Sequence, residues 1–305
     1  METLNTPTAS IVIPTLNAAP YLPALIPALQ QQSLKPVETI LVDSGSTDGT
    51  KDIAAGFEGV RLVDLDRFTH GRSRNRGVKE ASGDIVVLMT QDSVPRNNAW
   101  LANLVTALNE PNVVAACSRQ IPNDDATPME RFFLQKRFPE AGEIRSLETL
   151  GDDVAYEKIV FSDVSCAVKR DTLMNHPYDE TLIMSEDQQL ARDLILAGYA
   201  MAYVPESIVV HSHRYSLWQT FKRYFDSIYA LATIFPEQNT AASAKMGMAY
   251  VREELAYLTK TAPLWLLYYP FYTATKAAAT LLAHHADGLP RWLLKRISMH
   301  AYHWK

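Results

Sequence analysis

Residues 83–95 read GDIVVLMTQDSVP, an apolar run rich in β-branched side chains that ends in a lone acid and a proline. Such a run is typical of a buried strand, and the polar residues after it mark the point where the strand ends. Asp92 would then lie at the carboxyl edge of a sheet, where ligands bind in open α/β folds. A carboxylate in that place can hold a divalent cation against phosphate oxygens, but it can equally cap the next helix. The run by itself leaves both interpretations open.

The sequence on either side of this run alternates between strand and helix patterns. In the first half we expect strands and helices in turn at residues 10–14, 20–32, 38–42, 48–57, 60–64, 73–81 and 85–89. Helical stretches of about a dozen residues between strands indicate βαβ units and a mostly parallel sheet, so the predicted class is α/β. Further along we expect strands at 113–117, 162–168, 202–205 and 208–211, a polar segment at 122–158, and helices at 185–197 and from 217 onward.

The composition is that of a globular protein. The chain has 305 residues, of which 47% are hydrophobic and 21% charged, so it is too apolar for a disordered chain. Residues 1–9 form a short polar tail with no apolar leader behind it, and we expect no secretion signal. Cys117 and Cys166 have no CxxC partner and no histidine at metal-site spacing. We therefore expect buried, reduced thiols in a cytoplasmic protein.

The charge is unevenly distributed along the chain. The net charge is −5, whereas residues 256–305 hold six Lys or Arg against one acid, Asp287. An acidic body with a basic, aromatic tail argues against general nucleic-acid binding. The charge of the tail allows contact with an anionic membrane surface.

Two segments near predicted strand ends have the residue types that bind nucleotides. Asp43 follows the strand at 38–42 and precedes small residues, so it could accept hydrogen bonds from a base or ribose, or belong to a tight turn before a capped helix. Residues 68–77 read FTHGRSRNRG and place three arginines and a histidine around a predicted helix start. Arginine forks and helix N-terminal amides both favour phosphate. Because Asp43 and Asp92 should flank this segment, we favour diphosphate binding over a solvated basic loop.

Acids and histidines occur at two later element ends. Glu186 and Asp187 open the helix at 185–197, where the helix dipole favours acids. That local explanation is simpler than the functional one, a general base that points into a cleft. His211 and His213 follow a predicted strand and share one face of an extended segment, so they could reach one metal ion or form a surface pair.

Taken in order, these motifs resemble a known family. They are IVIPTLN at 11–17, ILVDSGSTDGT at 40–50, Arg74-Asn75, TQD at 90–92, Glu186-Asp187 and His211. The series resembles the inverting family-two glycosyltransferases of the GT-A fold over roughly residues 9–215. The stretch from His70 to Asn75, together with TQD, looks most like the bacterial rhamnosyltransferases that use dTDP-L-rhamnose.

The resemblance implies a Rossmann-like mixed sheet flanked by helices. It places a GT-A catalytic domain at residues 1–215, with a nucleotide-binding half at about 9–95 and an acceptor half at about 96–215, and a helical C-terminal extension at 216–305. The donor nucleotide sugar would be bound at the strand ends and in the arginine-rich segment, by Pro14, Thr15, Asn17, Asp43, Ser44, Arg74, Gln91 and Asp92. Among these, Asp43 would meet the pyrimidine base and Arg74 would face the diphosphate.

The resemblance also implies a metal site. Asp92 matches the last acid of the family's Asp-x-Asp motif, and His211 matches a histidine that completes the metal site in some members. The chain departs from the motif at its first acid, which is Thr90 here. A neutral hydroxyl gives the ion less charge compensation than a carboxylate. A hard-oxygen site with one histidine suits Mg²⁺ or Mn²⁺.

The catalytic residues implied by the resemblance are the acids that open the helix at 185–197. Asp187 matches the general base, with Glu186 beside it. Asp187 would take the proton from an acceptor hydroxyl as that hydroxyl attacks the anomeric carbon. A single displacement inverts the configuration, so a β-L-rhamnosyl donor would give an α-L-rhamnoside.

Apolar and basic segments alternate along the C-terminal extension. Residues 263–271 read PLWLLYYPF and residues 291–296 read RWLLKR, and no run reaches the ~20 mostly apolar residues of a transmembrane helix. The extension would either pack on the catalytic domain or on a second copy of the chain, or lie at the membrane interface and bring the enzyme to a lipid-linked acceptor. A homodimer is left open.

The expected function is transfer of a sugar onto a hydroxyl of a glycan or lipid-linked acceptor in bacterial surface polysaccharide assembly. The expected place is the cytoplasm or the cytoplasmic face of the inner membrane. Two alternatives are kept. Thr90 is compatible with a non-catalytic nucleotide-sugar-binding partner of an assembly complex. A sugar nucleotidyltransferase is disfavoured because residues 14–17, PTLN, are not a glycine- and arginine-rich loop.

Overall fold

The computed structural model describes residues 7–151, 154–236 and 240–305, so most of the expected polar tail at 1–9 lies outside the described residues. The chain divides into two compact units, which we call the sheet unit and the helical unit. The sheet unit comprises Met1–Ile121, Arg137–Thr181 and Glu186–His211. The helical unit comprises Pro122–Lys136, Leu182–Ser185 and Ser212–Lys305.

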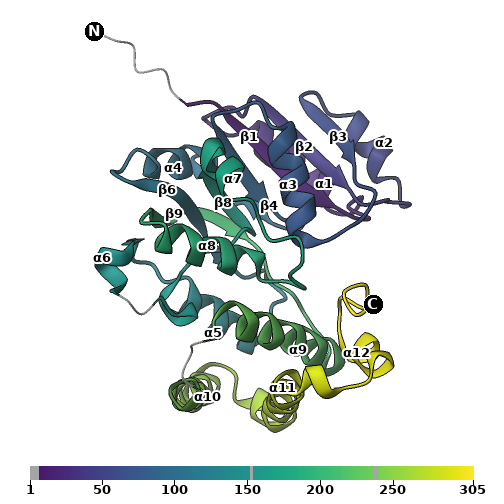
Figure 1. Cartoon of the computed structure of the whole chain (residues 1–305), viewed down its shortest axis with the longest axis vertical. Coiled ribbons are helices and arrows are strands. Elements are labelled where there is room, and N and C mark those ends of the chain that lie inside the picture. Colours follow the sequence, from purple (N-terminus) through teal and green to yellow (C-terminus); the bar gives the residue numbers. More distant parts are fainter. Residues whose placement is uncertain (1–6, 152–153, 237–239) are drawn as a thin grey trace. The chain divides into compact units, whose positions relative to one another are not determined.

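The sheet unit is built on a mixed sheet, as the resemblance implied (Figure 1). The strands in the described residues are β1 (Ala9–Thr15), β2 (Glu38–Asp43), β3 (Val60–Asp64), β4 (Ile85–Met89), β5 (Val94–Pro95), β6 (Val113–Ile121), β7 (Glu143–Arg145), β8 (Ser165–Lys169) and β9 (Ala200–Val210). Their order is β3-β2-β1-β4-β8-β6-β9-β5, with β7 paired to β9. The strands β3, β2, β1 and β4 are parallel to one another, and β8 is inserted antiparallel between β4 and β6.

Helices cover both faces of this sheet. In the sheet unit they are α1 (Leu22–Gln30), α2 (Thr50–Ala55), α3 (His70–Glu80), α4 (Trp100–Ala107), α6 (Leu147–Leu150), α7 (Arg170–Asn175) and α8 (Glu186–Leu196), with the 3₁₀ turn η1 (Tyr156–Lys158). Because successive strand residues face opposite sides, Ile11 and Ile13 join a buried cluster with α1 and α4, whereas Val12 faces α3. Gly77 lets α3 approach that closely, since a Cβ there would lie 2.1 Å from Val12 Cγ1.

The topology brings the polar strand ends to one edge of the sheet. The strands β1, β2 and β4 run parallel, so Thr15, Asp43 and Met89 end on the same side. Met89 pairs with Ser165 at the start of antiparallel β8, and Ile121 pairs with Val210 at the end of β6 and β9. In open α/β sheets this edge is where ligands bind.

The structure corrects several element boundaries. The strands expected at 202–205 and 208–211 are one strand, β9, whose pairing with β6 shifts register between Ser118 and Arg119. Pro205 cannot donate to the ladder, so a bulge carries the strand past it. The helix expected at 73–81 begins at His70, where Thr69 accepts a capping hydrogen bond from the Arg72 amide. The strand expected at 162–168 begins at Ser165, which leaves Asp163 in the preceding loop.

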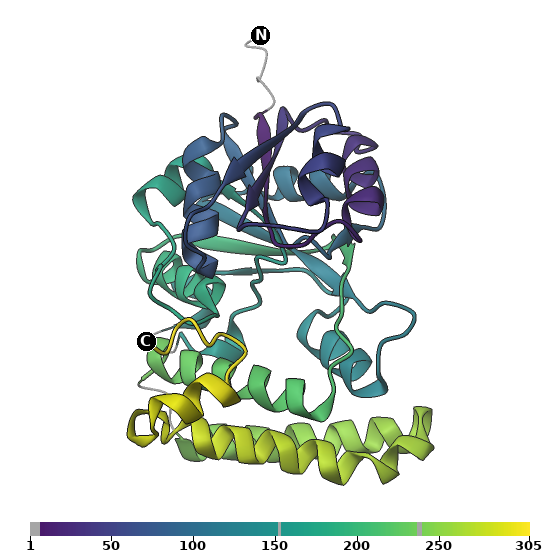
Figure 2. The same ribbon diagram turned by 90° about the vertical axis from the view of Figure 1, so that its right-hand side faces the viewer.

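The helical unit contains the expected C-terminal helices. Its elements are α5 (Pro128–Arg137), α9 (Leu217–Ile234), α10 (Thr240–Thr261), η2 (Pro263–Leu267), α11 (Tyr269–Ala283), η3 (Ala286–Gly288) and α12 (Arg291–Ile297). The last residue of α5, Arg137, is counted with the sheet unit. Helix α11 runs alongside α9 (Figure 2), and their shared core includes Phe225, Ala279 and Ile297. Within the described ranges, no helix is both long enough and apolar enough to cross a bilayer.

Candidate active site

Asp43 ends β2 and organises the loop that follows it. Its side chain is fully buried, and Oδ2 accepts hydrogen bonds from the amides of Gly45 at 3.1 Å and Ser46 at 3.0 Å. Burial would raise the pKa of Asp43, but the hydrogen bonds from Ser46 and Gly45 and the charge of Lys51 outweigh it and hold the pKa below its usual value. Asp43 is therefore an ionised carboxylate that shapes its own loop rather than an exposed group.

The loop after β1 is tied to the ends of both neighbouring strands. The Leu16 amide donates to Gln91 Oε1 at 2.8 Å, and Gln91 Nε2 donates back to the Leu16 carbonyl at 3.1 Å. On the other side the Asn17 amide donates to Ser46 Oγ at 2.8 Å, and Asn17 Oδ1 accepts from the Thr47 amide at 3.0 Å. These bonds hold Asn17 at a φ of 51°, a conformation that asparagine tolerates better than most residues. Gln91 and Asn17 thus fix the backbone next to Pro14 and Thr15.

Two hydroxyls at the sheet edge are buried without a hydrogen-bond partner among the described atoms. They are Ser44 Oγ, just after β2, and Thr90 Oγ1, just after β4. Buried polar groups are almost always satisfied in native proteins, so each calls for an explanation. A polar group of a bound ligand is one way to satisfy them.

Asp92 and His211 lie face to face at the same edge. The pairing of β5 with β9 sets Val94 opposite Val210, which brings Asp92 Oδ1 to 3.6 Å from His211 Nε2. On the other side of the ring, Nδ1 lies 3.0 Å from Oε1 of the buried Gln120. An amide oxygen can only accept, so this contact places a proton on Nδ1, and Nε2 is the ring nitrogen that faces Asp92. A carboxylate and an imidazole nitrogen so arranged form a donor pair suited to Mn²⁺ or Mg²⁺. His213, the second histidine that the sequence analysis considered, belongs to the helical unit.

Arg74 is the centre of a buried charged cluster. Its Nε forms an ion pair with Asp163, and its Nη1 lies 2.9 Å from Glu186 Oε1 and 3.0 Å from the carbonyl oxygen of His70. The guanidinium also lies 5.9 Å from the ring centroid of Tyr178. Only 4% of Arg74 is exposed. The guanidinium is therefore paired with carboxylates of the protein, and the contact between Arg74 and a diphosphate that the resemblance implies stays a prediction.

The two acids at the start of α8 have different surroundings. Glu186 is buried against Arg74, whereas Asp187 is partly exposed and accepts a long hydrogen bond of 3.4 Å from the Asp163 amide. Burial raises the pKa of Asp187 and the charge of Glu186 raises it further, while Arg74 partly opposes both. Burial also raises the pKa of Asp163 well above its usual value. Three carboxylates share one guanidinium here, and Asp187 is the one that a ligand can reach.

The other arginines of the 68–77 segment have their own partners. Arg72 pairs with Asp66 at 3.1 Å, and Arg76 pairs with Glu80 at 2.9 Å. These pairs lie on the exposed side of α3 and engage acids nearby in the sequence. The three arginines expected around a diphosphate are thus divided between one buried residue and two surface ion pairs.

Residues 163 and 164 connect the two groups of candidate residues. The Val164 carbonyl accepts hydrogen bonds from the Thr90 amide at 3.2 Å and from Ser93 Oγ at 3.0 Å, on the side of the Thr90–Asp92 turn. Asp163 next to it contacts Arg74 and Asp187. The sequence interpretation missed Asp163. The signal available was an acid in the loop next to a strand end, FSDVS at 161–165, which a longer predicted strand concealed.

Comparison with known proteins gives a family match and relatives over nearly the whole chain. Residues 10–174 match the family described as "Glycosyl transferase family 2". The chain is 30% identical over 304 residues to the O-antigen chain rhamnosyltransferase RfbN of Salmonella typhimurium, covering 97% of this chain and 95% of that protein. It is also 30% identical to the O-antigen chain rhamnosyltransferase WbaN of Salmonella anatum, covering 98% and 96% of the two chains.

A solved structure shows the same fold. The mannosyltransferase PcManGT from Pyrobaculum calidifontis, in complex with GDP-Man and Mn²⁺, superposes with a TM-score of 0.63 at 20% identity, covering 92% of this chain and 87% of that one. The same conclusion follows from the family match, from the two relatives matched over nearly their whole length and from this fold. The chain belongs to glycosyltransferase family 2, and it is a glycosyltransferase built on the GT-A fold.

Proposed function

We propose that the protein transfers L-rhamnose from dTDP-β-L-rhamnose, with inversion, onto a hydroxyl of a glycan or lipid-linked acceptor during bacterial surface polysaccharide assembly. The choice of sugar is supported by two relatives named as O-antigen chain rhamnosyltransferases, each matched over nearly the whole chain. The observation that carries the reaction type is the partly exposed Asp187, held beside a buried cluster at the same sheet edge as Asp92 and His211.

Asp187 is the proposed general base. Burial and the charge of Glu186 raise its pKa, which moves a carboxylate toward the strength that proton abstraction near neutral pH requires. It takes the proton of the acceptor hydroxyl as the oxygen bonds to the anomeric carbon and the bond to the nucleotide diphosphate breaks. Glu186 and Arg74 do not touch the reacting atoms in this scheme. They fix the start of α8 and set the charge around Asp187.

Asp92 and His211 are the proposed metal ligands. Their side chains offer one oxygen and one imidazole nitrogen 3.6 Å apart, and Gln120 orients the ring. The unpartnered hydroxyl of Thr90 leaves a neutral oxygen where the family has a carboxylate. A bound Mg²⁺ or Mn²⁺ would supply charge stabilisation for the departing diphosphate.

The donor nucleotide is proposed to lie along the loops after β1 and β2. Pro14 and Thr15 end β1, Asn17 lies in the loop after it, and Ser44 follows Asp43 in the second loop. Gln91 holds the first loop through two hydrogen bonds to Leu16, so its role is to position the backbone that meets the nucleotide. Asp43 does the same for the second loop.

The helical unit is the proposed membrane contact. Several large apolar side chains of its C-terminal elements are more than half exposed, among them Leu264, Leu267, Phe271 and Trp292. A peripheral element of this kind would bring the enzyme to a lipid-linked acceptor at the cytoplasmic face of the inner membrane.

One observation favours a second candidate, a non-catalytic nucleotide-sugar-binding partner. Thr90 removes one carboxylate from the metal motif. Hydrolysis of the donor without acceptor separates the two functions. The enzyme should release dTDP from dTDP-L-rhamnose with Mn²⁺ stimulation, and Asp92→Ala should abolish the stimulation. Binding of the donor with no release of dTDP would favour the second candidate.

The donor itself is tested by a panel of nucleotide sugars at equal concentration with Mn²⁺. We expect dTDP-L-rhamnose to be turned over fastest and to raise the unfolding midpoint most, because a ligand stabilises the native state according to its affinity. Faster turnover of GDP-mannose or UDP-GlcNAc would contradict the proposed donor.

A further inference from the structure

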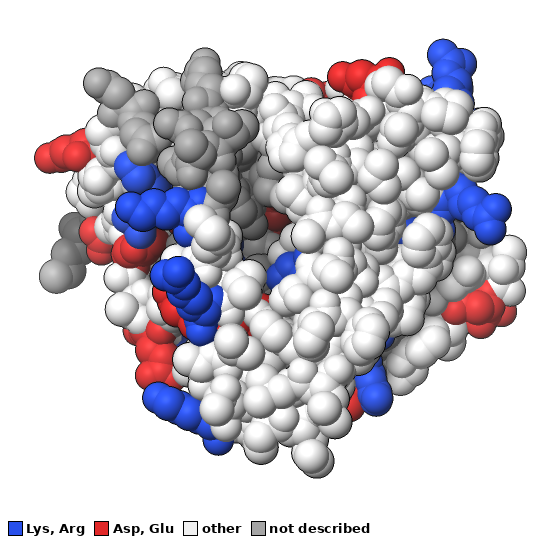
Figure 3. All heavy atoms as spheres, turned by 90° about the horizontal axis from the view of Figure 1, so that it is seen from below, with Lys and Arg blue, Asp and Glu red and all other residues white. Residues whose placement is uncertain are grey.

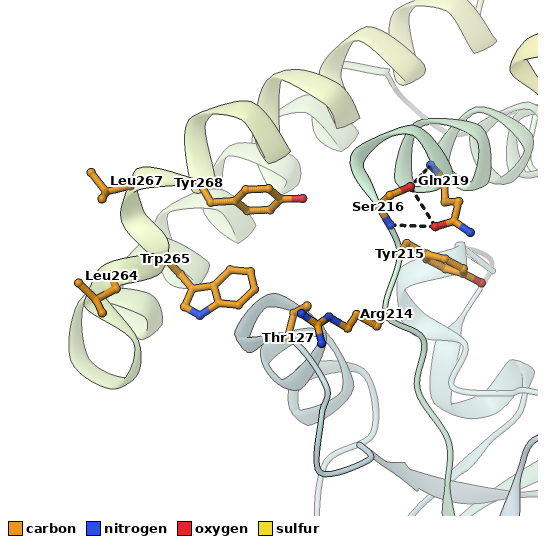
Figure 4. A pocket seen from close by; sticks show the side chains of 9 residues that line it. All are labelled: Thr127, Arg214, Tyr215, Ser216, Gln219, Leu264, Trp265, Leu267 and Tyr268. Atoms are coloured by element: carbon orange, nitrogen blue, oxygen red, sulfur yellow. Dashed lines mark hydrogen bonds between the residues drawn. The ribbon is translucent and has the colours of Figure 1, made fainter.

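The helical unit contains a pocket, and none of the residues that line it belongs to the candidate active site. It has a volume of about 640 Å³ and is lined by Thr127, by four of residues 214–219 and by four of residues 264–268. In Figure 4 the rings of Trp265 and Tyr268 point across the pocket toward Arg214 and Thr127. The side chains of Leu264 and Leu267 come from the same segment but point the opposite way, away from Arg214.

Arg214 gives this pocket an uncompensated positive charge. Its side chain is exposed, and within the described residues it forms no ion pair with a carboxylate. No Asp or Glu lines the pocket. Ser216 and Gln219 bond to each other in a capping box at the start of α9, so their polar atoms are already used. The positive end of the 18-residue helix α9 adds to the charge of Arg214. The pocket is therefore suited to an anion.

The rim of the pocket is apolar and open to solvent. Leu264 is 82% exposed and Leu267 is 80% exposed, and Phe271, one turn further on, is 64% exposed. Figure 3 looks onto the molecule from the side where α10 and α11 lie in Figure 1, and uncharged residues form a continuous area to the right of the centre of that view. Exposed apolar groups next to each other usually mark a surface that is covered in use.

The charge of the segment indicates what covers it. Residues 256–305 hold six Lys or Arg against one acid. One of the six, Lys276, is enclosed by aromatic rings, with its ammonium 4.7 Å from the Tyr224 centroid and 4.9 Å from that of Tyr272. The remaining bases and Arg214 favour an anionic partner, and the leucines favour an apolar one. An anion joined to a hydrocarbon chain satisfies both requirements.

We propose that this pocket binds the phosphate group of a membrane lipid, with Arg214 as the phosphate ligand and Leu264 and Leu267 inserted into the apolar layer of the same membrane. Trp265 and Tyr268 form the wall between the two environments, a place that suits amphipathic rings. The inference rests on the proposed membrane contact and names the site that makes it.

Vesicle flotation of the full chain tests the proposal. The vesicles are phosphatidylcholine with or without phosphatidic acid, which carries a bare lipid phosphate. Arg214→Gln removes the charge in the pocket, and Arg252→Gln removes the same charge from an exposed position of α10 that does not line it. A double change of Leu264 and Leu267 to Ser removes the rim, with Leu196→Ser on α8 as the matched control.

We expect the wild-type chain to float with phosphatidic acid vesicles. Arg214→Gln should weaken partition at least about tenfold, the effect of losing a charge-assisted hydrogen bond, whereas a general surface charge contributes at most about fivefold. The double leucine variant should lose more than about tenfold and Leu196→Ser should lose nothing. All four variants change exposed side chains, so equal unfolding midpoints confirm that they fold.

Three outcomes would overturn the proposal. Equal losses for Arg214→Gln and Arg252→Gln would mean general electrostatic attraction without a site. Flotation of the double leucine variant at the wild-type level would show that Leu264 and Leu267 do not insert into the membrane. Inorganic phosphate could also raise the unfolding midpoint of the wild type but not that of Arg214→Gln, while Arg214→Gln floats as the wild type does. That result would assign the pocket to a soluble anion. Release of dTDP by the wild-type chain without vesicles tests the transferase separately.

Discussion

Arg74 Nη1 donates to Glu186 Oε1 at 2.9 Å, and only 5% and 6% of the two side chains are exposed. This contact ties α3 to the start of α8, and the Nε atom of the same arginine pairs with Asp163. A buried arginine between two carboxylates costs much desolvation, so its geometry has to be closely determined. Asp187 is adjacent to Glu186, and the position and charge of the proposed base therefore depend on Arg74.

Replacing Arg74 with Lys should impair catalysis and shift its pH dependence. A lysine ammonium cannot reach both carboxylates as the guanidinium fork does, so the repulsion that raises the pKa of Asp187 is less well opposed. A base must be deprotonated, and a higher pKa moves the acidic limb of the kcat/KM profile to higher pH. We expect kcat/KM at neutral pH to fall by about tenfold to a hundredfold.

Arg76→Lys is the matched control for Arg74→Lys, because Arg76 lies on the same helix and pairs with Glu80 at the surface. Exposed ion pairs contribute at most about 1 kcal/mol, so this variant should keep the wild-type profile. An Arg74→Lys profile that coincides with the wild type would show that Arg74 does not set the charge of the base.

Gln120→Met should weaken metal binding without touching the proposed ligands. Gln120 Oε1 lies 3.0 Å from His211 Nδ1 and fixes the ring that faces Asp92. Loss of such an orienting partner typically weakens metal affinity by about tenfold or more. Titration of Mn²⁺ in the presence of dTDP, followed by calorimetry, measures this. Unchanged affinity in Gln120→Met, with the exposed Gln31→Met as control, would argue against His211 as a ligand.

Glu130→Gln should stabilise the protein at high pH. Burial raises the pKa of Glu130 to about 7, although the His213 amide and the charges of Arg223 and Lys276 partly oppose it. The folded state thus holds a proton that the unfolded chain loses near the usual pKa of 4.5, and wild-type stability falls as pH rises from 4.5 to about 7. Glutamine avoids this loss, so the variant should be roughly 2 kcal/mol more stable at about pH 8 and nearly equal to the wild type at about pH 5.

Urea unfolding at the two pH values measures the difference for Glu130→Gln. The exposed Glu110→Gln serves as control and should match the wild type at both. A stabilisation of Glu130→Gln that is equal at both pH values would contradict the role of its ionisation.

Gly71→Ala should destabilise the fold at the start of α3. A Cβ at this position would lie 2.4 Å from the backbone oxygen of Asp179, and backbone cannot move aside cheaply. We expect a loss of about 1–3 kcal/mol in the free energy of unfolding. Gly247→Ala in α10 is the opposite case, since a Cβ there meets nothing within 4 Å, and it should stabilise by about 0.8 kcal/mol. Chemical denaturation of both variants checks the sign of each change.

Local patterns in the sequence predicted the strands of the sheet well. The strands at 60–64 and 85–89 match the structure to the residue. At 85–89 the reason is an apolar run bounded by polar residues, which marks a buried strand at both ends. The single strand β9 was predicted as two, since Pro205 and Glu206 interrupt the pattern while pairing with β6 carries the chain through a bulge.

The charged cluster could not be predicted in the same way. Arg74 stands in a polar helix that reads as exposed, and its burial comes from Asp163 and Glu186, which lie far along the chain. Asp163 has no motif around it, and its place depends on the loop before β8 meeting α3 and α8. Asp92 and His211 were predicted together only through the resemblance, and the pairing of β5 with β9 supplies the physical reason for their contact.

The rate of rhamnosyl transfer from dTDP-β-L-rhamnose by Asp187→Asn tests the central claim most directly. Asp193→Asn is the control, because Asp193 lies on the same helix and is exposed, and its side chain accepts a hydrogen bond from Gln189 on the same helix. If Asp187 is the base, its amide variant should bind donor and Mn²⁺ as the wild type does, yet transfer at least about a hundredfold more slowly, while Asp193→Asn stays at the wild-type rate. Wild-type transfer by Asp187→Asn would contradict the account.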